Sequence, residues 1–151
     1  MDIKSKSERS KNMSAIRSKN TKPEQKIRKA LFAKGFRYRL NVSSIPGTPD
    51  IVLPKYKTVI FVHGCFWHGH KNCYLFKIPS TNRDFWKNKI EANYKRDREI
   101  MRKLSGSKWR ILIIWECSLK GKYKLNFDEL MEKVILFLHS NDIMYEIRGR
   151  E

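Results

Sequence analysis

The sequence predicts an α/β fold in which a mixed β-sheet is flanked by helices. Short apolar runs rich in β-branched residues have the length and composition of strands. Longer segments carry apolar residues at helical spacing, bounded by capping signals. The two kinds of segment follow one another as helix, strands, helix, strand, helix, an order that is typical of helices packed on both faces of one sheet.

The first helix is expected between Thr21 and Gly35. Thr21 is a suitable N-cap, Pro23 lies in the first turn, and Glu24 stands three residues after the cap, the spacing of a capping box. Gly35 is suited to the residue that follows a helix. The preceding residues 1–20 are polar and basic, and we expect them to form a flexible arm with a short helix around Met13, ahead of one domain over 21–151.

The next elements are predicted to be strands joined by proline-rich turns. Residues 36–42 alternate enough for a strand, and the turn Pro46–Pro49 leads into a second short strand at 50–53. A turn over 54–57 separates it from a third strand at 58–62. The turn residues between two β-branched runs indicate a hairpin.

The second half of the chain begins with a loop at 63–82 that has no periodicity. It holds three of the four histidines and two of the three cysteines, and a loop of this length in a small domain is usually functional or held by a metal. We expect the remaining elements to be a helix from 83 to 104 closed by Gly106, a buried strand at 109–115, a helix at 127–139 with Asn126 as cap and Glu129 as its reciprocal partner, and an edge strand within 142–151.

The composition favours a partner that is a polyanion. Lys plus Arg exceed Asp plus Glu by 33 − 15 = 18, which gives a net charge of +18 in 151 residues. A field of this size favours nucleic acid, although a merely soluble surface or a basic structural protein of the ribosomal kind has the same composition. No apolar run approaches a membrane span and no signal peptide is recognisable, so a cytoplasmic location is expected.

The cysteines predict a structural zinc site. Cys65, His70 and Cys73 lie within nine residues in the aperiodic loop, and Cys117 follows the buried strand. Three thiolates and one imidazole make a closed tetrahedral site of the structural type. His68 is a competing ligand, and three unrelated buried cysteines are the alternative.

Two carboxylates are candidates for catalysis. Asp50 opens a strand beside a second strand under a basic surface, where it could bind Mg²⁺, although an Asp after a Pro is often a simple turn residue. At 100° per residue, Asp97 lies in the middle of the apolar face of its helix. An inward carboxylate needs a partner or a role, and a salt bridge to Arg or Lys explains it equally well.

Histidines and aromatic residues surround these carboxylates in the sequence. His63 and His68 flank the end of the 58–62 strand, so either could take a proton from an attacking water near Asp50. Phe66 and Trp67 are candidates for wedges that unstack bases, whereas Trp86 fits the core of its helix equally well.

Several motifs in their order along the chain resemble the very-short-patch repair endonucleases. The resemblance runs from about residue 9 to 120 and then thins. The most specific string is His63-Gly-Cys65-Phe-Trp-His68. The other matching segments are Arg9–Met13, Pro46–Asp50, Val59–Val62, Cys73–Phe76, Phe85–Trp86, Arg96–Arg98 and Trp115–Cys117.

The resemblance implies a restriction-endonuclease-like three-layer fold with a structural zinc, and a Mg²⁺-dependent nick 5′ to the thymine of a T·G mismatch. Such mismatches arise when 5-methylcytosine deaminates. The expected partners are mismatched duplex DNA in the nucleoid and other mismatch-repair proteins, with the enzyme acting as a monomer. The matching positions imply that Asp50 and the Val62 carbonyl bind magnesium, that His68 activates water, and that His63, Asp97 and Glu24 are further active-site residues. They imply that the zinc ligands are Cys65, His70, Cys73 and Cys117. They also imply that Phe66, Trp67 and Trp86 intercalate between bases and that Met13 contacts the minor groove.

The chain departs from the family pattern at a few positions. Val62 stands where a threonine is familiar, and residues 69–73 replace a histidine-rich segment with one more residue. Glu24 also completes a capping box, so a purely structural role remains open. Two other functions stay open as well, namely a zinc-stapled restriction-type nuclease of other specificity and a zinc-containing DNA-binding module without catalysis.

Overall fold

The computed structural model describes residues 21–150. The expected basic arm at 1–20, its short helix and the contact assigned to Met13 lie outside the described residues. The helices are α2 (Lys22–Ala33), α3 (Arg83–Gly106) and α4 (Phe127–His139), and the strands are β1 (Arg39–Leu40), β2 (Ile51–Leu53), β3 (Thr58–His63), β4 (Arg110–Trp115) and β5 (Met144–Ile147), with single 3-10 turns at Pro54–Tyr56 and Glu116–Ser118.

The five strands form one mixed sheet in the order β1-β2-β3-β4-β5. The first three strands are antiparallel neighbours, and the β2–β3 pair is the expected hairpin, with Val52 opposite Val59. β3, β4 and β5 run parallel, which places His63 opposite Trp115 at the end of the central pair. Because β3 and β4 end at the same edge, the loops that follow them lie side by side there.

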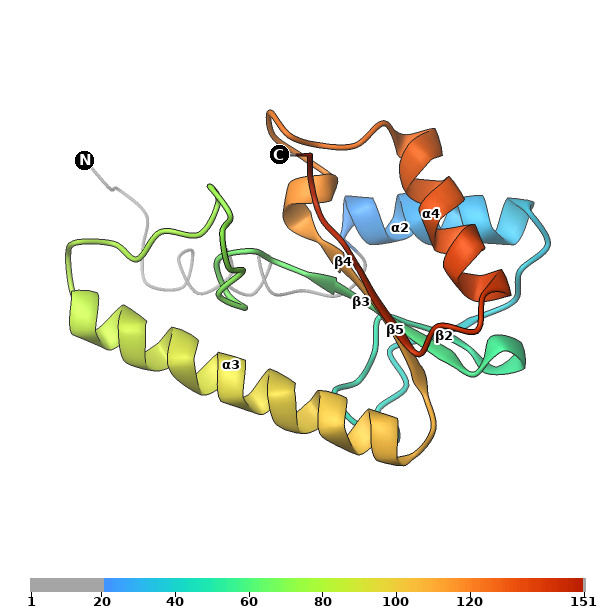
Figure 1. Cartoon of the computed structure of the whole chain (residues 1–151), viewed down its shortest axis with the longest axis horizontal. Coiled ribbons are helices and arrows are strands. Elements are labelled where there is room, and N and C mark those ends of the chain that lie inside the picture. The colour runs from blue at the N-terminus through green and yellow to red at the C-terminus, as the bar shows by residue number, and fades with distance from the viewer. Residues whose placement is uncertain (1–20, 151) are drawn as a thin grey trace, which may run out of the picture.

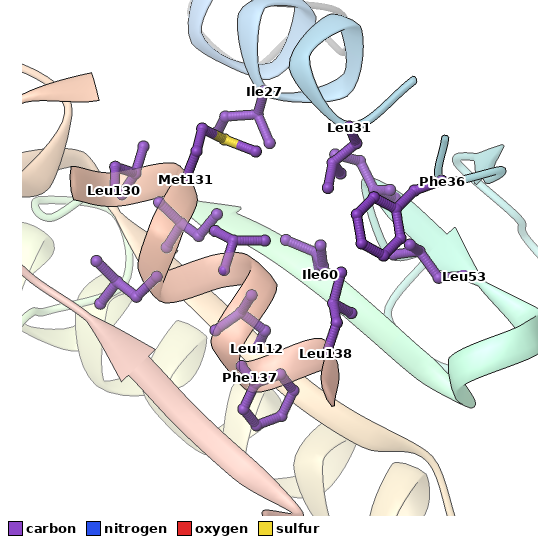
Figure 2. Packing of buried hydrophobic residues seen from close by; sticks show 14 of the residues in the cluster. Ile27, Leu31, Phe36, Leu53, Ile60, Leu112, Leu130, Met131, Phe137 and Leu138 are labelled. Atoms are coloured by element: carbon purple, nitrogen blue, oxygen red, sulfur yellow. The ribbon is translucent and has the colours of Figure 1, made fainter. Parts of the chain in front are cut away.

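Helices cover both faces of this sheet (Figure 1). α2 and α4 lie on one face and the long α3 crosses the other. Side chains alternate accordingly: Ile60 and Leu112 point to α2 and α4, whereas Phe61 and Ile113 belong to the cluster on the α3 side. Figure 2 shows the first cluster, in which residues of α2 and α4 meet those of β3 and β4. The three-layer arrangement confirms the predicted α/β fold.

α3 is unusual because it is long and mostly polar. Of its 24 residues it buries Ile90 and Leu104, and part of it extends beyond the sheet edge (Figure 1). A helix that buries so few residues gains little hydrophobic stabilisation from the core, and its exposed polar face is available to contact a binding partner. No helix within residues 21–150 is long and apolar enough to span a membrane.

Three differences from the sequence expectations exceed a shift of one residue at an element end or concern a cap. β1 is two residues long rather than seven, because only Arg39 and Leu40 pair with β2. α3 continues through Gly106 to a cap at Ser107. The predicted reciprocal cap of α4 is wrong: the Asn126 side chain accepts from the amide of Asp128, and Glu129 forms an ion pair with Arg150 instead.

Candidate active site

A cleft of about 1050 Å³ opens at the sheet edge where β3 ends. Its walls come from the start of α2, the turn before β2, the end of β3, the following loop, the middle of α3 and the turn after β4. The polar residues that line it include Glu24, Asp50, His63, His68, Lys89, Asn93, Arg96, Asp97, Glu116 and Lys120.

Asp50 is fixed at the floor of this cleft by the neighbouring strand. Its Oδ2 accepts a hydrogen bond of 2.7 Å from the amide of Val62. The turn before it is tightly fitted, since Gly47 has φ +80° and a Cβ at this position would lie 2.6 Å from the Ile100 side chain. A turn that tolerates no side chain therefore sets the position of the carboxylate relative to β3 and α3.

Two histidines and a carboxylate form a compact group beside Asp50. The rings of His63 and His68 stack at 3.8 Å with an interplanar angle of 5°. His68 Nδ1 lies 2.6 Å from Asp97 Oδ2, so the ionised carboxylate accepts the Nδ1 proton. The lone pair of the neutral imidazole is then on Nε2. Asp97 thus orients His68 and selects a tautomer in which the other ring nitrogen can take up a proton.

His63 differs from His68 in its surroundings. It is 6% exposed, and its Nδ1 has no hydrogen-bond partner within residues 21–150. Burial, followed by the nearby His68 and His70, holds the pKa of His63 well below its usual value. His63 is therefore neutral at physiological pH and supports the His68 ring by packing rather than by charge.

Aromatic rings gather at the side of the cleft formed by the loop and α3. Phe66, Trp67 and Trp86 contact one another at centroid distances between 5.4 and 5.9 Å. Asn93 donates a 3.0 Å hydrogen bond to the carbonyl of Trp67 and so ties the loop to the helix. All three residues are half-buried and belong to neither core cluster, so part of each side chain is exposed to solvent.

The four expected zinc ligands also come together, three from the same loop and Cys117 from the turn after β4. Cys65, His70, Cys73 and Cys117 place one ligand atom each within 4.8 Å of the others, so this group could hold a metal ion. His70 Nδ1 lies 3.5 Å from the Cys65 sulfur and 3.7 Å from the Cys117 sulfur. The His70 ring stacks at 3.8 Å on Trp115, the last residue of β4.

Burial governs the protonation of this group in the metal-free chain. It raises the pKa of the Cys65 and Cys117 thiols, and it lowers that of His70 to about 4, with Arg148 adding to the effect. The imidazole is thus neutral and ready to bind a metal, whereas the two thiols must lose protons when one binds.

Comparison with known proteins relates the chain to one family. The family model described as DNA mismatch endonuclease Vsr matches residues 1–75. A protein of Escherichia coli with the same description is 45% identical over 133 residues, covering 88% of this chain and 85% of the relative. The chain belongs to the DNA mismatch endonuclease Vsr family.

Two further relatives are described as type II nicking enzymes. V.NmeAIP of Neisseria meningitidis is 50% identical over 80% of this chain and 86% of its own length. V.XorIIP of Xanthomonas oryzae is 47% identical over 71% of this chain and 78% of its own length. The Vsr family is restriction-endonuclease-like, and the observed mixed sheet between helices agrees with the fold expected from the sequence.

The group of His63, His68 and Asp97 is a second potential metal site by distance, but its geometry favours proton transfer. Two parallel stacked rings direct their nitrogen lone pairs side by side rather than toward one point. His68 Nδ1 is also engaged with Asp97 at hydrogen-bond distance. Of the two groups, the Cys₃His group therefore has the geometry better suited to hold a metal ion.

The predicted site residues divide between the two places. The cleft collects the carboxylates and histidines together with Val62, Phe66 and Trp67, and Trp86 joins it through the aromatic cluster. Glu24 is buried at 6% and lines the cleft, and its amide also donates to Thr21 Oγ1 as a capped helix requires. Glu24 therefore lies in the wall of the cleft and also in the capped first turn of α2.

Sequence reasoning missed several residues of the cleft. Lys89 and Asn93 line it from α3, about two turns and one turn before Asp97 respectively, and their helical spacing could have indicated this. Glu116 accepts a 3.1 Å hydrogen bond from the amide of Cys65 and pairs with Lys120 at 2.9 Å. It connects the loop to the turn after β4, a contact across 51 residues that no local pattern indicates.

Proposed function

We propose that this chain nicks duplex DNA 5′ to the thymine of a T·G mismatch and thereby initiates very short patch repair of deaminated 5-methylcytosine. The observation that carries the proposal is the arrangement of Asp50, His63, His68 and Asp97 in one cleft with half-buried aromatic rings along its side. Membership of the Vsr family and the net charge of +18 support it.

We further propose that the Cys₃His group binds a structural zinc ion. With Zn–S near 2.3 Å and Zn–N near 2.0–2.1 Å, a tetrahedral site separates sulfur and nitrogen by about 3.6 Å. The 3.5 and 3.7 Å separations at His70 Nδ1 match this spacing. All four protein ligands are supplied and three are buried, which is characteristic of a closed structural site rather than of a catalytic one.

The residues of the cleft fit a catalytic magnesium ion. Asp50 and the carbonyl of Val62 are hard oxygen donors of the kind that Mg²⁺ prefers, and a DNA phosphate would add more. Within residues 21–150, Asp50 belongs neither to the Cys₃His group nor to the group of His63, His68 and Asp97, so its carboxylate is not a member of a site built mainly from nitrogen or sulfur ligands. When bound, Mg²⁺ would stabilise negative charge on the phosphate and on the leaving 3′-oxygen.

The chain's own residues then perform the proton chemistry. The carboxylate of Asp97 holds the Nδ1 proton of His68, and His68 Nε2 accepts a proton from the attacking water. The imidazolium that forms is stabilised by the adjacent Asp97 carboxylate. His63 stacks on the ring and keeps its orientation. Lys89 and Arg96 line the cleft as cations and would attract the DNA backbone.

Recognition of the mismatch is proposed to use the aromatic cluster. A wobble pair unstacks more cheaply than a matched pair, so residues that penetrate the stack select it. Phe66, Trp67 and Trp86 provide rings on two elements that the Asn93 hydrogen bond holds together. Met13 is proposed as the contact from the minor groove on the basis of the family resemblance.

The remaining assignments follow from this activity. We propose that residues 21–151 act as one domain, since the walls of the cleft come from elements spread along the described chain, and that the protein acts as a monomer. Its substrate places it at the nucleoid in the cytoplasm. A nick leaves a 3′-hydroxyl that must be extended, so other repair proteins are expected partners.

Substitution of Asp50 by asparagine tests the proposal. The amide keeps an oxygen that can accept from the Val62 amide but loses the charge that binds a metal, so we expect nicking of a T·G duplex to fall about 10³-fold, equivalent to roughly 4 kcal/mol. DNA binding should change less than threefold. Asp142→Asn, an exposed position away from the cleft, is the matched control, and nicking by Asp50→Asn at the control rate would contradict the proposal.

A further inference from the structure

The last described residues of the chain cross the proposed zinc centre. After β5, Arg148 donates to the carbonyls of Lys71 and Asn72 at 3.2 and 2.7 Å. The amide of Gly149 donates to the sulfur of Cys117 at 3.3 Å. The amide of Arg150 donates to the carbonyl of Tyr123 at 2.7 Å. We call residues 148–150 the C-terminal strap.

The strap contacts the part of the metal centre that has least support of its own. Lys71 and Asn72 are exposed and lie between the ligands His70 and Cys73. Asn72 has φ +55°, a left-handed conformation that costs free energy for a residue with a side chain. Because the Arg148 guanidinium binds both carbonyls of this turn, it fixes the spacing of the two ligands on either side.

The fit at Gly149 is close enough to be specific. A Cβ on this residue would lie 2.5 Å from the carbonyl oxygen of Cys117 and 2.7 Å from that of Tyr123. Glycine therefore allows the backbone to approach the Cys117 sulfur. An amide that donates to a thiolate stabilises its negative charge.

Charge gives the strap a second role. Three thiolates around one divalent ion carry a net charge of −1, and Arg148 brings a permanent positive charge to the ligand turn. Partners of this kind orient the ligands of a metal and tune its affinity.

We infer that Arg148 and Gly149 of the C-terminal strap position the ligands of the metal centre and that Arg148 sets how tightly the ion is held. The inference rests on the proposed zinc site.

Metal release from the purified full-length protein tests this inference. Zinc content is measured first, and then transfer of the ion to a chromophoric chelator is followed by absorbance for wild type, Arg148→Gln and Arg150→Gln. Outer partners of metal ligands are typically worth about 10–100-fold in affinity, so Arg148→Gln should release zinc at least about tenfold faster. Arg150→Gln removes an ion pair with Glu129 from the same segment and should stay within twofold of wild type.

Two further readouts separate the outcomes. With cobalt in place of zinc, Arg148→Gln should shift the thiolate-to-metal absorption bands while its far-ultraviolet circular dichroism stays unchanged. Wild-type protein with less than one equivalent of zinc would refute the proposed zinc site itself. A full equivalent with wild-type release from Arg148→Gln, or equally fast release from both variants, would overturn the role of Arg148.

Discussion

The contact between His68 and Asp97 makes the sharpest prediction about catalysis. The 2.6 Å distance places a negative charge directly behind the histidine that is proposed to take a proton from water. Asp97→Asn keeps the shape of this side chain and an oxygen that can accept from Nδ1, but removes the charge. The substitution therefore separates orientation of the ring from stabilisation of the imidazolium.

The magnitude follows from the exposure of the pair. Two unit charges about 4 Å apart attract by about 1 kcal/mol in water and about 4 kcal/mol at an effective dielectric constant of 20. The side chains of His68 and Asp97 are 28% and 21% exposed, so an intermediate value of roughly 1.5–3 kcal/mol is appropriate. This corresponds to a decrease in the rate of the chemical step of about 10–100-fold.

The assay is single-turnover nicking of a T·G duplex at saturating protein, with binding measured separately by fluorescence anisotropy. Glu91→Gln is the matched control, because it removes one negative charge from an exposed position on the same helix. We expect Asp97→Asn to lose rate and keep affinity, whereas Glu91→Gln should change neither by more than twofold. A nicking rate for Asp97→Asn within twofold of wild type would refute the proposed role of the carboxylate.

Three other predictions concern the metal centre, the aromatic cluster and the turn before β2. Removal of zinc by a chelator should lower the melting temperature by at least about 10 °C in calorimetry. Zinc binding contributes roughly 10–16 kcal/mol in small zinc-binding peptides, and even about 4 kcal/mol would have this effect on a chain of this size. Rebinding at pH 7 should release at least two protons, and zinc affinity should weaken as the pH falls, because burial raises the pKa of the Cys65 and Cys117 thiols. An unchanged melting temperature would count against a structural role. Trp67→Ala should reduce the preference for T·G over T·A duplexes in competition binding by about 5–100-fold, since stacking on a base contributes roughly 1–3 kcal/mol. The control Phe32→Ala removes an aromatic side chain that is 54% exposed on α2 and should leave the preference unchanged. Equal preferences in the two variants would exclude Trp67 as a wedge between bases. Gly47→Ala should destabilise the protein by about 1–3 kcal/mol in urea unfolding, because Gly47 has a positive φ and an added Cβ would contact Ile100. Gly106→Ala is the control and should be neutral or stabilising, since Gly106 has open space around it at the end of α3. A larger loss of stability in Gly106→Ala than in Gly47→Ala would contradict the geometry of this turn.

The sequence predicted most of the fold because its elements are locally determined. α4 occupies the predicted range from Phe127 to His139, since its apolar stripe and polar flanks agree with one another. β1 was overestimated because alternation shows which residues could pair, but not how many find a partner strand. Glu129 satisfies the spacing of a capping box, yet the distant Arg150 competes for it.

Part of the candidate site could also be predicted from the sequence, because some of its residues are placed by local helix geometry. Stepping along α3 by 100° placed Asp97 on the inward face, and the structure has it there. Its partner could not be deduced, because His68 lies 29 residues away in a loop without periodicity. The strap at Arg148 and the connection through Glu116 depend on tertiary contacts across 76 and 51 residues, and no local pattern contains them.

The central proposal is that the cleft nicks DNA at a mispaired thymine. The most direct measurement compares two oligonucleotide duplexes that differ only in T·G against T·A, each incubated with the zinc-loaded protein and Mg²⁺ and resolved on a denaturing gel. We expect a single nick 5′ to the thymine in the T·G duplex and an intact T·A duplex. Equal cleavage of both duplexes, or cleavage of neither, would contradict the proposal.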